Sequence, residues 1–149
     1  MTVLDIGNNV AVNNQILASR YAASVSTPTA LDLQGVTWAF IHFDVGSKTG
    51  STSIYTYTVE DSPDNVTFST VKKWTDGEVS TDDAEIVIAA DGTGQETTYH
   101  VAVEAGHLDR YMRVTCVLSG GGADTIDTAV CVITMPNYTG DSDTPDFSI

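Results

Sequence analysis

The sequence GHLDRYMRVTCVLSGGGADTIDTAVCVITM, residues 106–135, predicts two β-strands joined by a glycine-rich turn. In its first half apolar and polar side chains alternate, which places Met112, Val114 and Cys116 on one face. A period of two is typical of a half-buried antiparallel strand. The glycines of the turn can take positive φ, which a hairpin connection requires. We therefore expect a β-hairpin with its second strand over 128–135, in an all-β protein.

The strand predicted over 37–45 has two apolar faces. One face carries Ala39, Ile41, Phe43 and Val45, and the other carries Trp38, Phe40 and His42. Such a strand is either central in its sheet or meets a partner with its second face. A further strand is predicted over 54–60, with Tyr55, Tyr57 and Val59 on one face, and others over 66–74, 85–88 and 97–103. Turn signals recur about every 8–12 residues, which favours an antiparallel β-sandwich, jelly-roll or immunoglobulin-like, with about seven or eight strands.

Acidic turns separate several of these strands. In the turn at 61–65, Pro63 presets φ and Asn65 tolerates the left-handed conformation. This turn and the acidic loop at 76–83 carry carboxylates that suit Ca²⁺, which takes about 6–8 oxygens. Neither follows an EF-hand pattern, and side chains that cap backbone groups of the turn are the favoured interpretation.

The composition divides the chain into three parts. We expect an N-terminal arm over 1–29, a β-sandwich domain over 30–137 and an acidic C-terminal tail over 138–149. A short helix is an alternative for 13–21 in the arm, but its surroundings favour an extended chain. The tail ends on Phe147 and Ile149, an apolar tip that suits docking on a neighbouring subunit, although a disordered terminus is favoured.

The charge excludes two classes of partner. Six Lys and Arg residues stand against 20 Asp and Glu residues, which gives a formal net charge of −14. Nucleic acids and anionic membranes both require cationic neutralisation, so neither is an expected partner. No signal peptide or membrane span is recognisable, and we expect synthesis in a cytoplasm. In that reducing compartment Cys116 and Cys131 are expected as small buried hydrophobic residues rather than as a disulfide across the hairpin.

A search for catalytic chemistry yields no site. The three histidines, His42, His100 and His107, show no spacing typical of zinc ligands within one segment. No nucleophile elbow of the Gly-x-Ser-x-Gly type, phosphate-binding loop or dinucleotide fingerprint is present. We therefore predict no catalytic residues, no metal, no cofactor and no enzyme activity. A hydrolase that uses Asp or Glu is the least favoured alternative.

The order of segments resembles a known family. A stretch over 30–35 leads into an apolar strand, EDSPDNVTF follows at 60–68, and a strand with Tyr99 precedes DRYMRV at 109–114. A glycine-rich turn and an apolar strand that ends at 135–137 complete the order. This resembles small all-β structural proteins of tailed bacteriophages, in particular capsid decoration (cement) proteins. The resemblance covers about 30–137 and implies fold more securely than function.

The resemblance implies a virion protein on the capsid surface that binds the assembled head shell and stabilises it. The expected partner is the major capsid protein, and the expected state is a homotrimer. Aromatic and Arg residues are the usual interface anchors. The interface candidates are Trp38, Phe40, Tyr55, Tyr57, Trp74, Arg110, Tyr111 and Arg113. For the two arginines, ion pairs with nearby acids are favoured over a capsid contact. The alternative function is a carbohydrate- or receptor-binding β-sandwich module of a virion or cell surface.

Overall fold

In a computed structural model, the protein consists almost wholly of β-strands. The structure describes residues 11–22, 24, 29–50, 52–75, 78–88, 97–120 and 124–136, without the side chains of 74–81, 97 and 136. Within these ranges the one helical element is a 3₁₀ turn, η1, over Ala105–His107. The strands are β1 (Ala11–Tyr21), β2 (Leu31–Asp32), β3 (Val36–Thr49), β4 (Ile54–Ser62), β5 (Ser69–Thr70), β6 (Lys72–Thr75), β7 (Glu78–Asp83), β8 (Glu85–Ile88), β9 (Thr97–Glu104), β10 (Tyr111–Ser119) and β11 (Thr125–Pro136).

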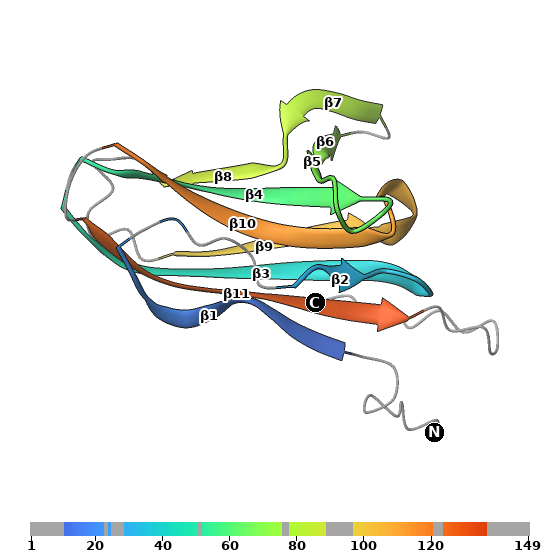
Figure 1. Ribbon diagram of the computed structural model, residues 1–149, viewed down its shortest axis with the longest axis horizontal. Helices are drawn as coiled ribbons and strands as arrows, with labels where there is room; N and C mark the ends of the chain where they lie inside the picture. The colour runs from blue at the N-terminus through green and yellow to red at the C-terminus, as the bar shows by residue number, and fades with distance from the viewer. Residues whose placement is uncertain are drawn as a thin grey trace.

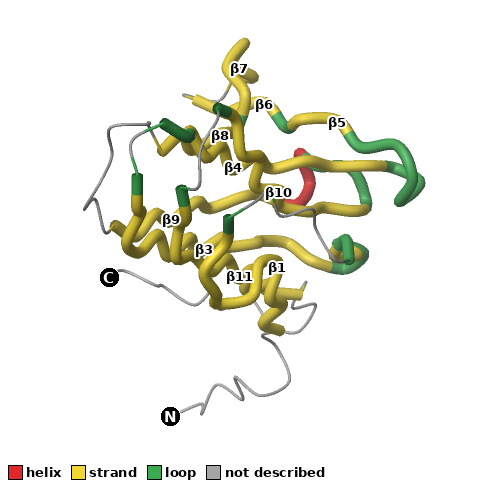
Figure 2. The backbone as a smooth tube through the Cα atoms, turned by 60° about the vertical axis from the view of Figure 1, so that its left-hand side comes forward, coloured by secondary structure: helices red, strands yellow, loops and turns green. Residues whose placement is uncertain are grey.

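The strands form two main sheets that pack face to face, as Figure 1 shows. The four-stranded sheet has the order β1-β11-β3-β9. The second sheet has the order β2-β10-β4-β5, and β8 also pairs with β4. A small third sheet, β6-β7, projects away from the second sheet (Figures 1 and 2). The antiparallel β-sandwich predicted from the sequence is confirmed.

The order of the eight principal strands identifies this sandwich as a jelly roll. In chain order these strands are β1, β2, β3, β4, β8, β9, β10 and β11. The first pairs with the last, the second with the seventh, the third with the sixth and the fourth with the fifth. The chain is therefore one long ribbon of paired strands, and successive pairs lie alternately in the two sheets. This is the jelly-roll arrangement, and it decides between the two types of sandwich that the sequence left open.

The stretch that predicted a hairpin holds both expected strands, but they do not pair with each other. β10 pairs with β2 and β4, whereas β11 pairs with β1 and β3. The predicted hairpin is wrong because the chain crosses from one sheet to the other between these strands. Each strand has one apolar face, and the crossing lets the two faces cover each other across the core. Gly120, with φ of +99°, serves this crossing as it would have served a hairpin.

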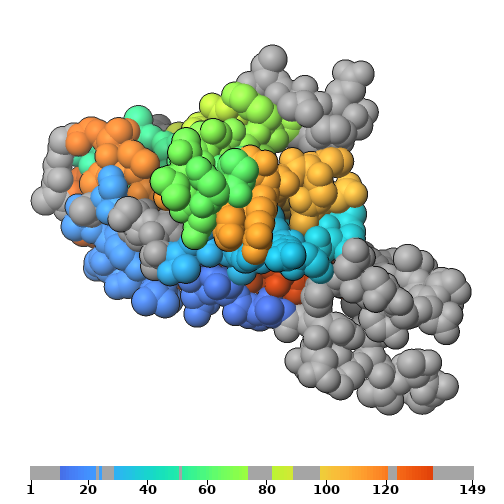
Figure 3. Space-filling view, turned by 45° about the vertical axis from the view of Figure 1, so that its right-hand side comes forward, coloured from blue at the N-terminus to red at the C-terminus, as the bar shows by residue number. Residues whose placement is uncertain are grey.

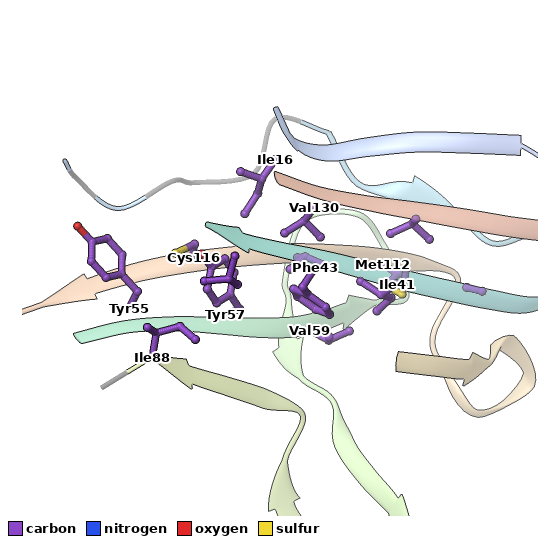
Figure 4. Packing of buried hydrophobic residues seen from close by; sticks show 14 of the residues in the cluster. Ile16, Ile41, Phe43, Tyr55, Tyr57, Val59, Ile88, Met112, Cys116 and Val130 are labelled. Atoms are coloured by element: carbon purple, nitrogen blue, oxygen red, sulfur yellow. The ribbon is translucent and has the colours of Figure 1, made fainter. Parts of the chain in front are cut away.

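Side chains from both sheets fill the space between them, as Figure 4 shows. Phe43 of β3 meets Tyr57 of β4 edge to face, with ring centroids 5.9 Å apart. Aromatic pairs favour this geometry because a ring edge is positive and a ring face is negative. The faces predicted for β3, β4 and β10 are confirmed. The largest fully buried side chains are Tyr55, Tyr57, Phe43, Ile16, Ile41, Met112, Ile126, Gln15, Val45, Val114, Val130 and Val132.

β1 forms an edge of the four-stranded sheet through its pairing with β11. The extended conformation favoured for 13–21 is confirmed, and this part of the expected arm belongs to the sandwich. The pairing with β11 shifts around Gln15, so Gln15 and Ile16 both point inward and are 0% and 2% exposed. Gln15 Oε1 accepts a hydrogen bond from the Val114 N–H of β10, at 3.1 Å. One buried amide therefore joins the two sheets. Residues 1–10 and 138–149 lie outside the described residues.

The carboxylate of Asp124 links two segments of the chain by hydrogen bonds at one end of the sandwich. Asp124, only 6% exposed, lies just before β11 and accepts hydrogen bonds from the backbone N–H groups of Thr52 and Ser53, at 2.8 and 2.6 Å. The Thr52 hydroxyl donates a third hydrogen bond to this carboxylate, and the Tyr55 hydroxyl donates one to the backbone carbonyl of Asp124 at 3.0 Å. These bonds hold the β3–β4 connection against the start of β11. They also lower the pKa of Asp124, with the backbone bond from Thr52 as the largest cause.

The turn after β4 has the chemistry that the sequence predicted. Asn65 takes a φ of +61°, and Asp64 Oδ1 accepts hydrogen bonds from the backbone N–H groups of Val66 and Thr67, both at 2.9 Å. Figure 3 shows this region, in green, beside the start of β10, in orange. The strand predicted over 66–74 is wrong in extent, because the turn continues to Thr67 and the short strands β5 and β6 follow. The predicted acidic loop at 76–83 contains a strand, β7.

Replacement of Gln15 by Leu should destabilise the protein. The change nearly keeps the side chain's volume but removes the oxygen to which the buried Val114 N–H donates, and removal of one partner of a buried hydrogen bond costs about 1–3 kcal/mol. Urea unfolding measures the loss. The matched control is Gln34→Leu at an exposed position, which should change the free energy of unfolding by less than about 0.5 kcal/mol. Equal stability of Gln15→Leu and the wild type would contradict the role assigned to this amide.

The Asp124 carboxylate should make the stability depend on pH in the acid range. Its pKa is lower in the folded state than the unfolded value of about 3.9. The stabilisation is therefore complete above the unfolded pKa and is lost as the pH falls through the folded pKa. Asp124→Asn should be less stable than the wild type at pH 7, and the difference should shrink on acidification. Urea unfolding at several pH values tests this, and a difference independent of pH would contradict it.

Candidate functional site

The outer face of the four-stranded sheet carries a continuous row of apolar side chains. The register places Val12, Ile133, Phe40 and Ala102 side by side across β1, β11, β3 and β9. In the next row Met135 and Trp38 are neighbours. Because alternate residues of these strands point into the core, all of these side chains point away from it. We call Val12, Trp38, Phe40, Ala102, Ile133 and Met135 the outer patch.

Two aromatic side chains form the centre of the outer patch. Trp38 and Phe40 are 40% and 41% exposed, and their rings stack with centroids 6.5 Å apart and planes 24° apart. Large apolar side chains on the surface are normal when scattered singly, whereas a contiguous group marks an interaction site. The sequence prediction that the second face of this strand is apolar is confirmed, and the described residues leave that face uncovered.

The outer face of the second sheet has a different character. Arg113 of β10 donates a hydrogen bond to Glu60 of β4 at 2.6 Å, and its guanidinium lies 3.8 Å from the centre of the Phe68 ring. Thr115 and Thr58 pair across the same two strands. Exposed apolar residues occur there as well, but β-branched valines such as Val87 and Val117 replace the aromatic pair. The two faces of the sandwich are therefore chemically distinct.

Two of the predicted interface residues lie in the core. Tyr55 and Tyr57 are 0% and 1% exposed, because their positions in β4 alternate toward the interior together with Val59. Burial raises the pKa of both hydroxyl groups, since a phenolate would be desolvated there. The prediction that they share one face is correct. That face meets the other sheet, so these tyrosines do not contribute to an outer surface of the protomer.

The predicted arginines form ion pairs, as the sequence favoured. Arg110 binds Asp32 through two nitrogens, with Nη2 at 2.8 Å, and the hydrogen bond raises the pKa of the guanidinium and lowers that of the carboxyl. Its guanidinium also lies 5.1 Å from the centre of the half-buried Tyr111 ring. The side chain of the remaining candidate, Trp74, lies outside the described residues. Trp38 and Phe40 are thus the exposed aromatic members of the predicted set.

The structure also brings together two residues that the sequence did not connect. His42 of β3 stands directly opposite His100 of β9, and their Nδ1 atoms are 3.3 Å apart. Cys131 of β11 stands opposite His42 on its other side. The register between strands distant in sequence creates this row, so spacing along the chain gave no signal for it. His107 lies apart, with Nδ1 3.7 Å from Glu104.

Charged groups elsewhere are engaged with one another. A hollow of about 300 Å³ lies where β1, β3 and β11 meet, and Arg20, Asp44 and Asp127 are among its lining residues. Arg20 binds Asp127 through Nε and Nη2, at 2.7 and 2.6 Å. Among the described residues no group of three or more His, Cys, Asp or Glu side chains is arranged to hold a metal ion. In the same part of the chain, no helix is long and apolar enough to cross a membrane.

Comparison with solved structures gives matches to proteins of a viral particle. One is VP2 in the crystal structure of a subviral particle of infectious bursal disease virus, with a TM-score of 0.51 and 10% identity. That match covers 86% of this chain and 33% of VP2. A structure of the Gx strain of the same virus has a TM-score of 0.46 and 12% identity, over 87% of this chain and 32% of that one. The likeness is one of fold.

The match concerns only part of the viral proteins, because this chain spans about a third of their length. No protein-family model and no characterised protein sequence matches the chain. The comparison with VP2 agrees with the β-sandwich that the strand order defines. Jelly rolls occur in viral capsid domains and also in lectin domains, so the role of the chain has to be argued from its surface.

The two cysteines should differ sharply in reactivity. Both are free, and Cys116 is buried in the core whereas Cys131 lies half-buried on the outer face. Burial raises the pKa of the Cys116 thiol to about 11, so little of the reactive thiolate forms at neutral pH. A thiol reagent should label the native wild type once, at Cys131, and the urea-unfolded protein twice. Native Cys131→Ser should resist labelling. Rapid labelling of Cys116 in the native protein would contradict the core described above.

Proposed function

We propose that the protein is a structural protein of a virion that decorates the capsid. It binds the assembled head shell, with the major capsid protein as its partner, and stabilises the shell. We further propose that it acts as a homotrimer on the capsid surface, without enzyme activity. The jelly-roll fold is compatible with this role, and the sequence resemblance to phage decoration proteins points in the same direction.

The outer patch is the single observation that carries the proposal. Trp38 and Phe40 are exposed, stacked on each other and surrounded by further apolar side chains of the same sheet. Interface cores are rich in aromatic residues and poor in charge. The outer patch has this composition, and the acidic Glu104 of β9 stands opposite Trp38 at its margin. A decoration protein needs such a surface because it acts through the area that it buries on the shell.

The charge of the chain suits a site on the outside of a filled shell. With 20 acidic and six basic residues the protein has little to attract packaged nucleic acid. The net charge of −14 also keeps unbound copies soluble and apart. Binding then depends on the match between one apolar face and the shell, and not on long-range attraction to DNA.

Replacement of both aromatic residues should abolish binding to the shell. Trp38→Ser combined with Phe40→Ser removes the centre of the outer patch, and loss of an anchor residue typically costs 2 kcal/mol or more, which is about thirtyfold in affinity. The assay is co-sedimentation with undecorated head shells of the virus that encodes the chain. The wild type should sediment with the shells and saturate at a fixed ratio, and the double variant should stay in the supernatant.

The matched control is Val87→Thr combined with Val117→Thr on the outer face of the second sheet. These valines are 56% and 50% exposed, so the change removes apolar surface of comparable exposure from the opposite face. The control should bind the shells as the wild type does. Circular dichroism melting shows whether each variant is folded, and native mass spectrometry reports the oligomeric state. Absence of wild-type binding at high protein concentration would overturn the proposed function.

A second function is favoured by the same exposed aromatic residues. Trp and Phe rings on a jelly roll also suit a sugar ring, and lectin domains share this fold. A glycan array with and without Ca²⁺ separates the two functions. Binding of the wild type to a glycan, lost in the Trp38 and Phe40 variant, would favour a carbohydrate- or receptor-binding module.

A further inference from the structure

We propose that His42 and His100 form a binding site for a divalent transition-metal ion on the outer face of the four-stranded sheet. The two side chains come from neighbouring strands, β3 and β9, and occupy directly opposite positions of the ladder. Their Nδ1 atoms are 3.3 Å apart, and their ring centroids are 4.9 Å apart. The site is independent of the proposed capsid function.

The separation of the two nitrogens matches the geometry of a bound ion. Zinc binds imidazole nitrogen at about 2.0–2.1 Å in tetrahedral geometry, so two such nitrogens stand about 3.3–3.4 Å apart. The observed separation is 3.3 Å. The same separation allows a hydrogen bond between the rings, in which one Nδ1 carries the proton and the other accepts it. A bound metal ion would take the place of that proton. Binding of one ion by both nitrogens requires the two rings to rotate about their side-chain torsions so that both lone pairs point to the ion.

The surroundings allow an ion to reach this pair and to stay. His100 is exposed and His42 is half-buried, so the ion arrives from solvent without any opening of the sheet. His42 lies in the inner strand β3 and His100 in the edge strand β9, and the ladder between these two strands fixes the distance between their backbones. A preformed pair of ligands needs little ordering on binding.

The ligand chemistry selects the class of ion. Imidazole suits Zn²⁺, Cu²⁺ and Ni²⁺, whereas Ca²⁺ and Mg²⁺ prefer oxygen. Asp44 is the next residue of β3 on the same face and supplies an anionic neighbour. Because no third ligand is in place among the described residues, water completes the coordination. The ion is therefore held by two protein ligands and is expected to exchange with solvent.

Bound metal would connect β3 to β9 on the surface opposite the core. An ion that binds the folded state and not the unfolded state stabilises the protein by RT ln(1 + c/Kd), where c is the free ion concentration, and so raises the melting temperature as c increases. The row that contains His42 and His100 lies next to the outer patch, since His42 is two residues from Phe40 on one face of β3. The site thus places a positive ion at the border of the apolar surface.

Isothermal titration calorimetry with ZnCl₂ tests the site in the intact chain. The wild type should bind one Zn²⁺ at the histidine pair, and His42→Asn and His100→Asn should each weaken this binding by about tenfold or more. Thermal melting supplies a second readout: Zn²⁺ should raise the melting temperature of the wild type and not that of either variant. CaCl₂ should not distinguish the wild type from the variants.

Two control variants exclude other sources of binding. His107→Asn removes the third histidine, which lies beside Glu104, and should leave zinc binding unchanged. Cys131→Ser removes the thiol opposite His42 and should also retain binding. Wild-type binding that His42→Asn and His100→Asn leave intact would assign it to the many carboxylates and overturn the proposal. Loss of binding in Cys131→Ser would overturn the assignment to two imidazoles.

Discussion

The burial of the inward faces of β3 and β11 against those of β4 and β10 is the constraint on which the rest of the structure depends. Each of these strands is apolar at alternate positions, and each buries its apolar face against the opposite sheet. This requirement sends the chain across the core between β10 and β11 and so produces the jelly-roll order. Gln15 and Asp124 then act at the margins, where their side-chain oxygens accept hydrogen bonds from backbone N–H groups.

Much of this fold is predictable from local patterns. Local patterns located the strands at 37–45, 85–88 and 97–103, and the strict period of two divided the side chains of 37–45 correctly between two faces. The turn at 61–65 was also predictable from its own residues, because Pro63 presets φ and Asn65 tolerates a positive φ. The pairing was not, since a glycine-rich turn serves a hairpin and a crossing between sheets equally well. The choice between a hairpin and a crossing depends on which apolar faces bury one another in the complete fold, and the turn itself does not show this.

The candidate site shows the same division between local and non-local information. The second apolar face of β3 was recognisable, and with it the exposed pair Trp38 and Phe40. Tyr55 and Tyr57 carried the same compositional signal yet lie in the core, because residue type alone does not say which face of a strand is inward. The His42–His100 pair depends on the register between two strands that lie far apart in the sequence.

The chemical difference between the two outer faces is the central claim of this account. One face presents an aromatic pair among apolar neighbours, and the other presents threonines and an Arg113–Glu60 ion pair. A cryo-electron microscopy reconstruction of head shells saturated with the wild-type protein tests it most directly. The account predicts that Trp38 and Phe40 face the major capsid protein. A reconstruction in which Arg113 and Val117 contact the shell while Trp38 points to solvent would contradict it.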